Sequence, residues 1–413
     1  MHQSFKYRLY PFRNQERELL RQLDELKFLW NYALDQRIAA WRLEKKSIGY
    51  VDQCRSLVRW RAFNKEGLGR VYGHVAQEML ARLEDAFKHF FRRVKAGEKP
   101  GFPCFKREVT SLTYPDSNDS ATIVPGCHQT KRLHLRKLGD IPIEVHREPP
   151  NARKKTCTVK REGGRWYAIL TYEVADPAPP PDMPPETPMG MDLGLTHLAA
   201  LSTGEVVEPP HFLRHAETRL KRQQKRLSRK RKGSANWHKQ RNRVVRCYAK
   251  VRDQRRDFAH KLTTGWAKEY DLMAFEDMDL RGPSRSRLSK SILDAGWGML
   301  RHMSSYKQRS RGQRYVEVPT RDTTQSCSVC GEKANPPLTI NDRVFQCPRG
   351  HVEDRDVNAA RNVLNRALAI VGRGTPESKP VETGPPPTSS RKGKGRRVRS
   401  MKQEPPTALE VAV

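Results

Sequence analysis

Residues 190–202 read GMDLGLTHLAALS, a short apolar run that carries one acidic residue, Asp192. A run of this length, closed by a turn at 203–204, favours a buried β-strand. Two further runs, YDLMAFE at 270–276 and RYVEV at 314–318, are strand candidates of the same kind. A carboxylate buried in such a strand is destabilising unless a cation or hydrogen bonds compensate. Taken alone, this acid is explained equally well by a structural carboxylate that hydrogen bonds compensate and by a functional site.

Two more acids occupy comparable positions. Glu276 ends the second strand candidate, and Asp356 opens a helix predicted over about 356–370. For Asp356 alone, capping of the helix N-terminus is an equally good interpretation. Three acids on separate elements are suited to binding hard divalent ions through oxygen ligands. Two magnesium ions held about 4 Å apart by Asp192, Glu276 and Asp356 would activate water and stabilise the leaving oxygen in phosphodiester cleavage.

A cluster of cysteines lies between these elements. Two residues separate Cys327 from Cys330, and Cys347 follows later in the chain. Position 350, where a fourth cysteine would complete the pattern, is a glycine. His351 is the nearest replacement, and three cysteines with one histidine are an accepted set for structural zinc. The alternative for His351 is a hydrogen-bonding loop residue. If His351 binds, no position remains for water, so the zinc would be structural.

Composition points to an anionic partner. The 413 residues include 79 Lys and Arg against 46 Asp and Glu, a formal charge of +33, and only 36% are hydrophobic. We find no apolar run of about 18 residues that would span a membrane, and no apolar segment typical of a secretory signal at the N-terminus. We therefore expect a cytoplasmic protein without membrane contact or disulfides. So large a positive excess makes nucleic acid the first partner to consider.

The positive charge is concentrated in residues 214–261, which hold 19 Lys and Arg and three acids, mostly at helical spacing. A solvated helix face usually mixes charges, because like charges one turn apart repel. One sign dominates here, with aromatic residues interleaved, so we expect contact with nucleic-acid phosphates. The predicted contacts are Lys225, Arg226, Arg229, Lys230, Lys232, Lys239, Arg243 and Lys261.

The rest of the chain divides by pattern. Residues 4–10 form a strand candidate, and apolar residues at helical spacing predict a helical block over about 13–95. Short alternating runs broken by Gly and Pro follow, with a hairpin turn predicted at Gly163-Gly164. The Pro-rich stretch 176–188 indicates a domain boundary. From 374 onward the chain is nearly all polar, basic or Pro, which predicts a disordered basic tail.

Several motifs, taken in order, resemble the TnpB family, the RNA-guided nucleases of bacterial and archaeal insertion sequences and relatives of type V CRISPR effectors. The family is often described as an OrfB-type transposase. The resemblance covers nearly the whole chain. It rests on RLYP at 8–11 with FLWNYAL at 28–34, GFPCFK at 101–106, LSRK at 227–230, DFAHKL at 257–262, TTQSCSVCG at 323–331 and DRDVNAARN at 354–362.

The resemblance implies an α+β, multidomain fold. Residues 189–322 and 352–373 would form a RuvC-like nuclease domain of the ribonuclease H fold, with a zinc-binding knuckle at 323–351 inserted. Residues 1–12 and 96–180 would form a WED-like β-barrel, with a helical recognition domain at 13–95 inserted. A Pro-rich linker at 181–188 would join the halves, and the tail would span 374–413.

The resemblance also assigns roles. Asp192, Glu276 and Asp356 correspond to the family's catalytic acids, and Asp354 to a neighbour. The function implied is an RNA-guided, Mg²⁺-dependent DNA endonuclease of a transposable element, cleaving next to a short adjacent motif in double-stranded target DNA. We expect a monomer bound to guide RNA from the element, with two Mg²⁺ and one structural Zn²⁺, in the prokaryotic cytoplasm and associated with the nucleoid on target. The missing fourth cysteine departs from the family pattern and concerns only the zinc geometry.

Three other functions remain open. A transposase that joins DNA strands itself would need a different site, and we find no His-hydrophobe-His pair with a partner tyrosine. A nuclease-inactive, RNA-guided DNA-binding repressor would be expected to lose at least one acid, whereas all three are present. A plain basic RNA-binding protein leaves the three acids unexplained.

Overall fold

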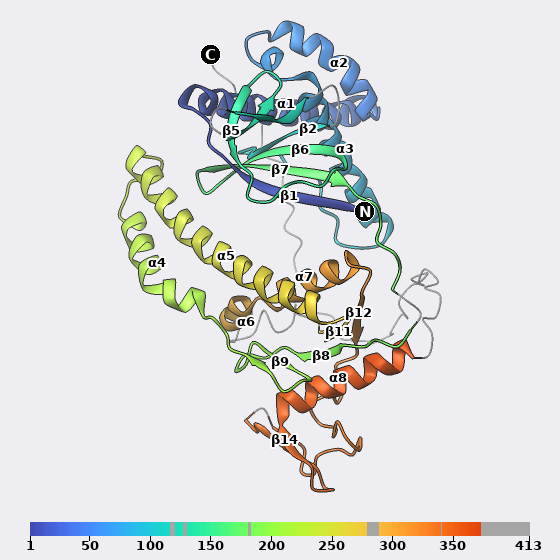
Figure 1. Ribbon diagram of the computed structural model, residues 1–413. Helices are drawn as coiled ribbons and strands as arrows, with labels where there is room; N and C mark the ends of the chain where they lie inside the picture. Colours follow the sequence, from blue (N-terminus) through green and yellow to red (C-terminus); the bar gives the residue numbers. More distant parts are fainter. Residues whose placement is uncertain (116–119, 127–129, 181–182, 279–288, 340, 373–413) are drawn as a thin grey trace, which may run out of the picture.

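The computed structural model describes all residues except 116–119, 127–129, 181–182, 279–288, 340 and 373–413. Two sheets organise the chain (Figure 1). A seven-stranded sheet with three helices forms the N-terminal half, and a five-stranded sheet between helical layers forms the C-terminal half. The predicted tail lies outside the described residues. Every described helix is too short or too polar to cross a bilayer.

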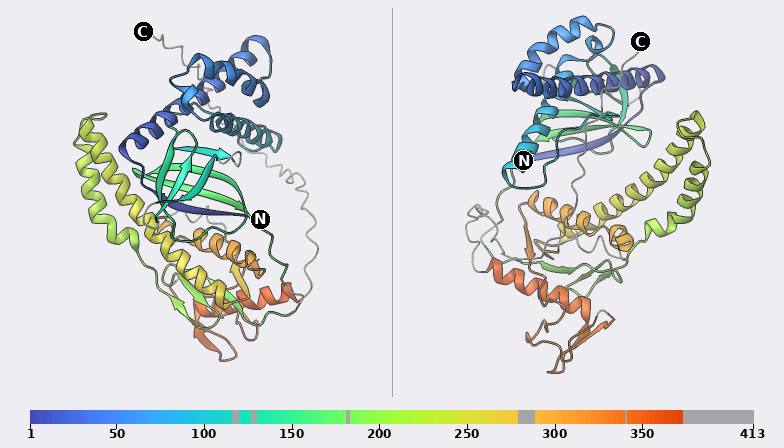
Figure 2. Two further views of the ribbon diagram at one scale, coloured as in Figure 1. Left: turned by 45° about the horizontal axis from the view of Figure 1, so that its top comes forward. Right: turned by 180° about the vertical axis from the view of Figure 1, so that it is seen from behind.

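The N-terminal sheet is antiparallel in all of its pairings and runs in the order β2-β6-β7-β1-β5-β4-β3. Its strands are β1 (His2–Leu9), β2 (Ser111–Pro115), β3 (Ala121–Pro125), β4 (Lys131–Leu135), β5 (Gly139–Glu144), β6 (Arg153–Glu162) and β7 (Arg165–Glu173). The predicted hairpin is confirmed, because Gly163 and Gly164 join β6 to β7 with positive φ angles. The sheet is strongly curved (Figure 2), but among the described residues no pairing joins its edge strands β2 and β3, so the barrel implied by the resemblance is not shown.

The predicted helical block consists of α1 (Arg13–Glu44), α2 (Tyr50–Phe63), the short 3₁₀ helix Leu68–Arg70 and α3 (Gly73–Lys95). The apolar stripes read from the sequence form one core with the sheet. Leu19, Leu26 and Leu34 of α1 and Leu80 of α3 are fully buried there, next to Tyr7 of β1. Helical periodicity thus predicted both the helices and the face that they bury.

The C-terminal sheet has the order β10-β9-β8-β11-β12. Its strands are β8 (Pro188–Asp192), β9 (Ala199–Leu201), β10 (Val206–Val207), β11 (Leu272–Glu276) and β12 (Arg314–Val318), and β11 runs parallel to both β8 and β12. The helices α5 (Ala235–Glu269), α6 (Ser289–Ala295) and α7 (Trp297–Arg309) cover one face, and α8 (Arg355–Val371) covers the other. The strands predicted at 270–276 and 314–318 and the predicted C-terminal helix are present. The run 190–202 does not form one strand: it contains the end of β8, a loop and β9, which pairs antiparallel with β8.

The Pro-rich stretch ends inside this sheet. Pro188 is the first residue of β8, and the amides of Glu186 and Thr187 donate to the Asp271 carboxylate at 2.7 and 3.1 Å. The last residues assigned to the linker are therefore held by the sheet.

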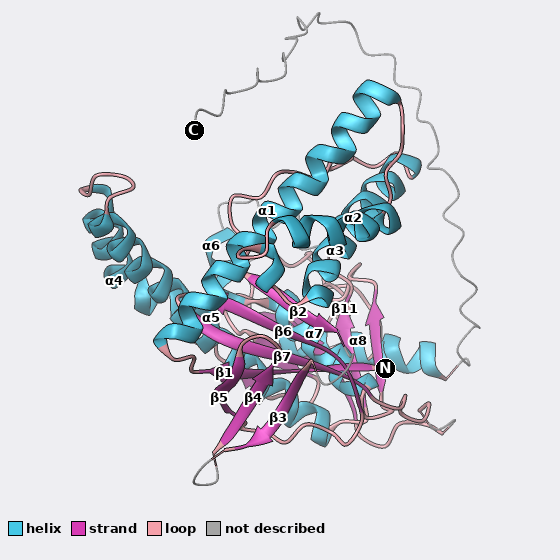
Figure 3. Ribbon diagram, turned by 90° about the horizontal axis from the view of Figure 1, so that it is seen from above, coloured by secondary structure: helices cyan, strands magenta, loops and turns pink. Residues whose placement is uncertain are grey.

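The basic stretch forms two helices that pack along each other. These are α4 (Phe212–Ser228) and α5, and together they project from the body as a long arm (Figures 1 and 3). Ser234 caps α5, its hydroxyl accepting a hydrogen bond from the Trp237 amide at 3.1 Å. The cysteine cluster precedes α8 in a small unit that contains the hairpin of β13 (Val344–Gln346) and β14 (Val352–Asp354).

Gly190 sets the distance between β8 and α8. A Cβ atom at this position would collide with the Ala360 carbonyl and lie 2.6 Å from the Leu364 amide nitrogen, and both are backbone atoms. We expect Gly190→Ala to lower the free energy of unfolding by about 3 kcal/mol, since the helix must move away from the sheet. Chemical denaturation of the free protein measures this.

The matched control is Gly265→Ala on α5, where no atom lies within 4 Å of the added carbon. That substitution should raise stability by about 1 kcal/mol, because alanine favours the helix. Equal stability of the two variants would contradict the close packing of β8 on α8.

Candidate active site and cysteine cluster

Asp192 is the last residue of β8, a central strand of the C-terminal sheet. Its side chain is buried, with a relative exposure of 8%. Burial raises the pKa of this carboxyl well above its ordinary value, and the nearby carboxylates of Glu276 and Asp356 raise it further. The carboxylates of the other two predicted acids therefore lie near enough for their charges to act on Asp192.

Glu276 reaches this site from the neighbouring strand. The parallel register pairs Phe275 of β11 with Met191 of β8, so Glu276 and Asp192 are the next residues on their strands. Burial raises the pKa of Glu276, while a hydrogen bond from the Thr323 hydroxyl, 2.5 Å from Oε1, acts in the opposite direction. Thr323 itself is buried.

Asp356 completes the site from α8. Its Oδ1 atom accepts hydrogen bonds from the Arg355 guanidinium at 3.0 and 3.2 Å. The helix cap is a different residue, because Asp354 Oδ1 accepts from the amides of Asp356 and Val357 at 2.9 and 3.1 Å. The capping interpretation thus applies to Asp354, whereas the Asp356 carboxylate pairs with Arg355 and lies 3.9 Å from Arg343.

The donor set fits hard divalent cations, since it consists of three carboxylates with mostly buried side chains. Among the described residues, only the three clustered thiols bring three candidate ligand atoms within 4.8 Å of one another; the three carboxylates are more widely spaced. Like charges in a buried site repel, so cations would be needed to draw these oxygens together.

The segment that carries the first two cysteines is held by side-chain amides of α8. Asn358 donates to the Ser326 carbonyl at 2.8 Å and accepts from the Ser328 amide at 2.8 Å. Asn362 donates to the carbonyls of Ser326 and Thr323 at 2.7 and 2.9 Å. The sequence motifs contained Thr323, Asn358 and Asn362, but their positioning role became visible only in three dimensions.

We expect Thr323→Val to reduce DNA cleavage about 10-fold to 100-fold, because Glu276 loses the hydrogen bond that orients its carboxylate. Valine keeps the size of the side chain, but the buried hydroxyl also lies 3.0 Å from the Thr320 carbonyl, so we expect a modest fall in melting temperature. Thr323→Ser retains the hydroxyl and should restore most of the activity. If the valine and serine variants cleaved equally well, the hydroxyl would have no positioning role.

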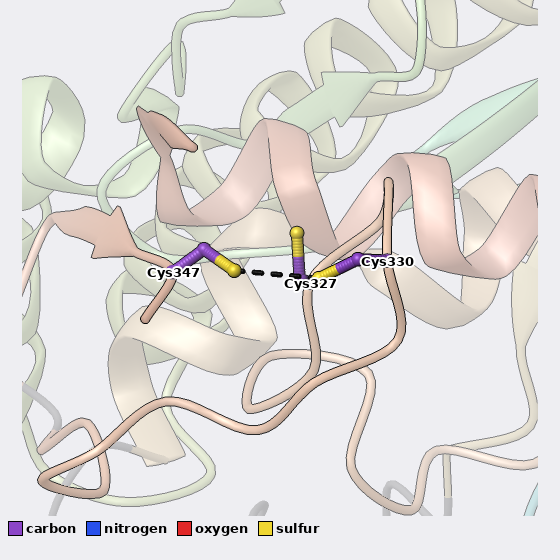
Figure 4. Close-up of side chains that lie close together, drawn as sticks. All are labelled: Cys327, Cys330 and Cys347. Carbon is purple, nitrogen blue, oxygen red and sulfur yellow. Dashed lines mark hydrogen bonds between the residues drawn. The ribbon is translucent and has the colours of Figure 1, made fainter. Parts of the chain in front are cut away.

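The predicted cysteine cluster is present. The sulfur atoms of Cys327, Cys330 and Cys347 lie within 4.8 Å of one another, and those of Cys330 and Cys347 are 3.4 Å apart (Figure 4). Three converging thiols suit a soft, tetrahedral metal such as zinc.

His351 is not part of this group of ligand atoms. Its carbonyl accepts a hydrogen bond from the Cys347 amide at 2.7 Å, which places its backbone beside the cluster. Its Nε2 atom instead lies 3.5 Å from Glu353 Oε2, and neither atom has a hydrogen-bond partner among the described residues. The fourth ligand therefore stays a prediction.

The predicted nucleic-acid contacts all have exposed side chains. All but Lys261 gather toward the outer end of the arm, on α4, on the loop after it and on the first turns of α5. Lys261 lies further along α5 and pairs with Asp257 at 2.8 Å. Most of the predicted nucleic-acid contacts therefore lie together on the outer part of the arm.

Three known families match the sequence. Residues 169–287 match the OrfB_IS605 family, described as "Probable transposase", and residues 297–363 match "Cas12f1-like, TNB domain". Residues 1–46 match a family described as "Helix-turn-helix domain". In this structure that last segment contains one strand, β1, and one long helix, α1.

Full-length relatives agree with these matches. A Streptomyces pristinaespiralis protein named "Putative RNA-guided DNA endonuclease" is 33% identical, over 98% of this chain and 96% of the relative. The Escherichia coli K12 protein InsQ, given the same description, is 31% identical over 90% and 94%. One chain of the cryo-EM structure of a Cas12f1–sgRNA–target DNA complex has the same fold, with a TM-score of 0.60 and 12% identity over 89% of this chain and 99% of that one.

These findings define the class as the OrfB-type proteins of insertion sequences. The chain belongs to the TnpB family of RNA-guided nucleases, as its motifs indicated.

Proposed function

We propose that this protein is an RNA-guided, Mg²⁺-dependent DNA endonuclease of a transposable element. The observation that carries the proposal is the position of Asp192 and Glu276 at the adjacent ends of two parallel strands, with Asp356 of α8 near enough for its charge to act on Asp192, in a strongly basic protein. Near-full-length relatives named as RNA-guided DNA endonucleases support it.

The sheet β8 to β12 with α8 would then be the RuvC-like nuclease domain, and residues 323–351 its zinc knuckle. The N-terminal sheet would act as the WED-like domain and α1 to α3 as the recognition domain. The partners would be guide RNA and double-stranded target DNA, bound by one protein molecule in the prokaryotic cytoplasm. Specificity would come from pairing between guide and target.

Each acid has a definable task in this mechanism. Asp192, Glu276 and Asp356 would hold two divalent cations, which supply activation of the attacking water and stabilisation of the leaving 3′ oxygen. Asp192, at the end of its strand, would lie between the other two acids. Thr323 would orient Glu276, and Arg355 would hold Asp356 until the cations bind. The arm would bind backbone phosphates through the eight predicted cations.

The knuckle would bind one zinc ion through Cys327, Cys330 and Cys347, with His351 as the fourth ligand. The close approach of the three thiols supports the site. With four protein ligands, zinc would have a structural role.

The test is to express the protein with its flanking DNA, isolate the complex, sequence the bound RNA and assay plasmid cleavage with Mg²⁺. A discrete RNA whose end matches the cleaved target would support the proposal. A specific RNA without cleavage would indicate a repressor, and strand joining without an RNA requirement would indicate a transposase.

A further inference from the structure

A cavity of about 370 Å³ lies in the seam between α4 and α5. Five cations line this seam cavity: Arg219 and Arg226 from α4, and Arg243, Arg246 and Lys250 from α5. None of its lining residues is acidic. Of these five, only Arg226 and Arg243 are among the contacts predicted from the sequence, and packing of the two helices adds the other three.

Some other cations on the same helices have acidic partners, but most, including Arg222 and Arg241, form no ion pair among the described residues. Lys221 pairs with Glu217 at 3.0 Å, Arg255 with Asp294 and Lys261 with Asp257. Within the described part of the chain, none of the five cavity cations forms an ion pair. All five side chains are exposed, so water and salt screen part of their mutual repulsion, but five like charges around one hollow still attract an anion.

Few apolar contacts hold the two helices of the arm together. Leu220 is the one buried residue of α4, and it faces a seam that includes the buried Val244 and Val251 of α5. Polar contacts supplement this core, since the buried Gln240 donates to the Gln223 carbonyl at 3.0 Å and Gln224 donates to the Tyr248 hydroxyl at 2.9 Å. So few apolar contacts make an anion that bridges both helices a substantial source of stability for the arm.

The base of the arm also contacts the N-terminal sheet. A Cβ atom at Gly163, in the β6–β7 turn, would lie 3.6 Å from the Ala249 side chain, and Arg252 pairs with Glu162 at 3.4 Å. Ala249 is the neighbour of the cavity residue Lys250. The residues that face the sheet, Val245, Ala249 and Arg252, lie on a different face of α5 from the cavity residues, over the same helix turns.

We propose that the seam cavity is a phosphodiester-binding site that grips the backbone of the bound RNA and joins α4 to α5. Arginines suit this task, because each can donate two parallel hydrogen bonds to one phosphate. The assignment to RNA rests on the proposed function, in which RNA is the permanent component and DNA is exchanged. A permanent anion compensates the five charges throughout the working cycle.

The first test uses Cys247, which also lines the cavity. Free protein, protein with its copurified RNA and protein with single-stranded DNA of the same sequence are treated with N-ethylmaleimide, and labelling is followed by peptide mass spectrometry. RNA alone should slow labelling of Cys247 at least about 10-fold, relative to the exposed Cys104. Equal slowing at both cysteines, or none at Cys247, would overturn the site, and protection that requires DNA would overturn the assignment to RNA.

The second test removes two cavity cations. Arg219→Gln with Arg246→Gln should weaken RNA binding and reduce the slope of log affinity against log salt by about 2 for a duplex-like contact, somewhat less for a single strand. The melting temperature of the RNA-free variant should equal or exceed that of the unmodified protein, because removal of two cations relieves repulsion in the cavity. The matched control is Arg222→Gln with Arg241→Gln, which removes the same charge from the same helices outside the cavity.

The cavity double variant and the control double variant should differ clearly in RNA affinity. If both weakened RNA binding equally, the cavity would be no more than part of a diffuse positive surface. If the cavity pair retained full RNA affinity and RNA-guided cleavage, the seam site would be wrong while the proposed function stood. Absence of cleavage by the unmodified protein would contradict the proposed nuclease function but not the seam site, since the labelling result does not depend on catalysis.

Discussion

Asp192→Asn is expected to abolish DNA cleavage, with a rate loss of about 10³-fold or more, which corresponds to about 4 kcal/mol of transition-state stabilisation. Asparagine has the same shape but lacks the charge that holds a cation. The side chain is buried at the end of β8, far from the positive outer end of the arm, so RNA binding should be unchanged. Plasmid cleavage and RNA affinity, measured on the same preparation, check both statements.

The same variant should not be less stable than the unmodified protein when metal is absent. Burial and the carboxylates of Glu276 and Asp356 raise the pKa of Asp192 in the folded state. An acid whose pKa is raised by folding binds its proton more tightly in the folded protein, so stability falls as the pH rises from the ordinary pKa of 3.8 toward the raised value. The asparagine side chain does not titrate, so the variant avoids this fall in stability. Its melting temperature at neutral pH should equal or exceed that of the metal-free unmodified protein.

Asp354→Asn is the control for Asp192→Asn. Asp354 caps α8, and asparagine is a comparable cap, so cleavage should remain within a few-fold. Added Mg²⁺ should raise the melting temperature of the unmodified protein and of this control, but much less that of Asp192→Asn. Cleavage by Asp192→Asn at a normal rate would remove Asp192 from the catalytic acids.

Cys330→Ser is expected to remove the zinc and to lower cleavage about 100-fold or more. The cysteine segment is bonded to Asn358 and Asn362 of α8, and Thr323 at its start orients Glu276. Loss of the metal would free this segment, so Glu276 would lose its hydrogen-bond partner and the first turns of α8 would lose their contacts with the segment. Zinc content measured by atomic spectroscopy, with cleavage and RNA binding on the same sample, tests the prediction.

Cys104→Ser is the matched control, since this exposed cysteine lies far from the cluster in sequence, and zinc and cleavage should be unaffected. His351→Cys should retain zinc, whereas His351→Ala should weaken its retention against a chelator. Full zinc content in His351→Ala under chelation would assign the fourth position to another ligand. Zinc loss in Cys330→Ser with unchanged cleavage would contradict the link from the knuckle to the acids.

Local patterns predicted much of this protein. The helix expected over 356–370 spans 355–371, and the strands expected at 270–276 and 314–318 are β11 and β12. The spacing of the cysteines predicted a cluster that the fold does assemble. Such features follow from the sequence because hydrophobic period, turn residues and ligand spacing act between near neighbours.

The tertiary structure decided the rest. It made Asp354 the cap of α8, paired Thr323 with Glu276 across 47 positions of sequence, and turned the His351 ring toward Glu353. It also brought cations of α4 and α5 around one cavity. These contacts join residues that are distant along the chain or choose between adjacent candidates, and packing determines them where no local pattern does.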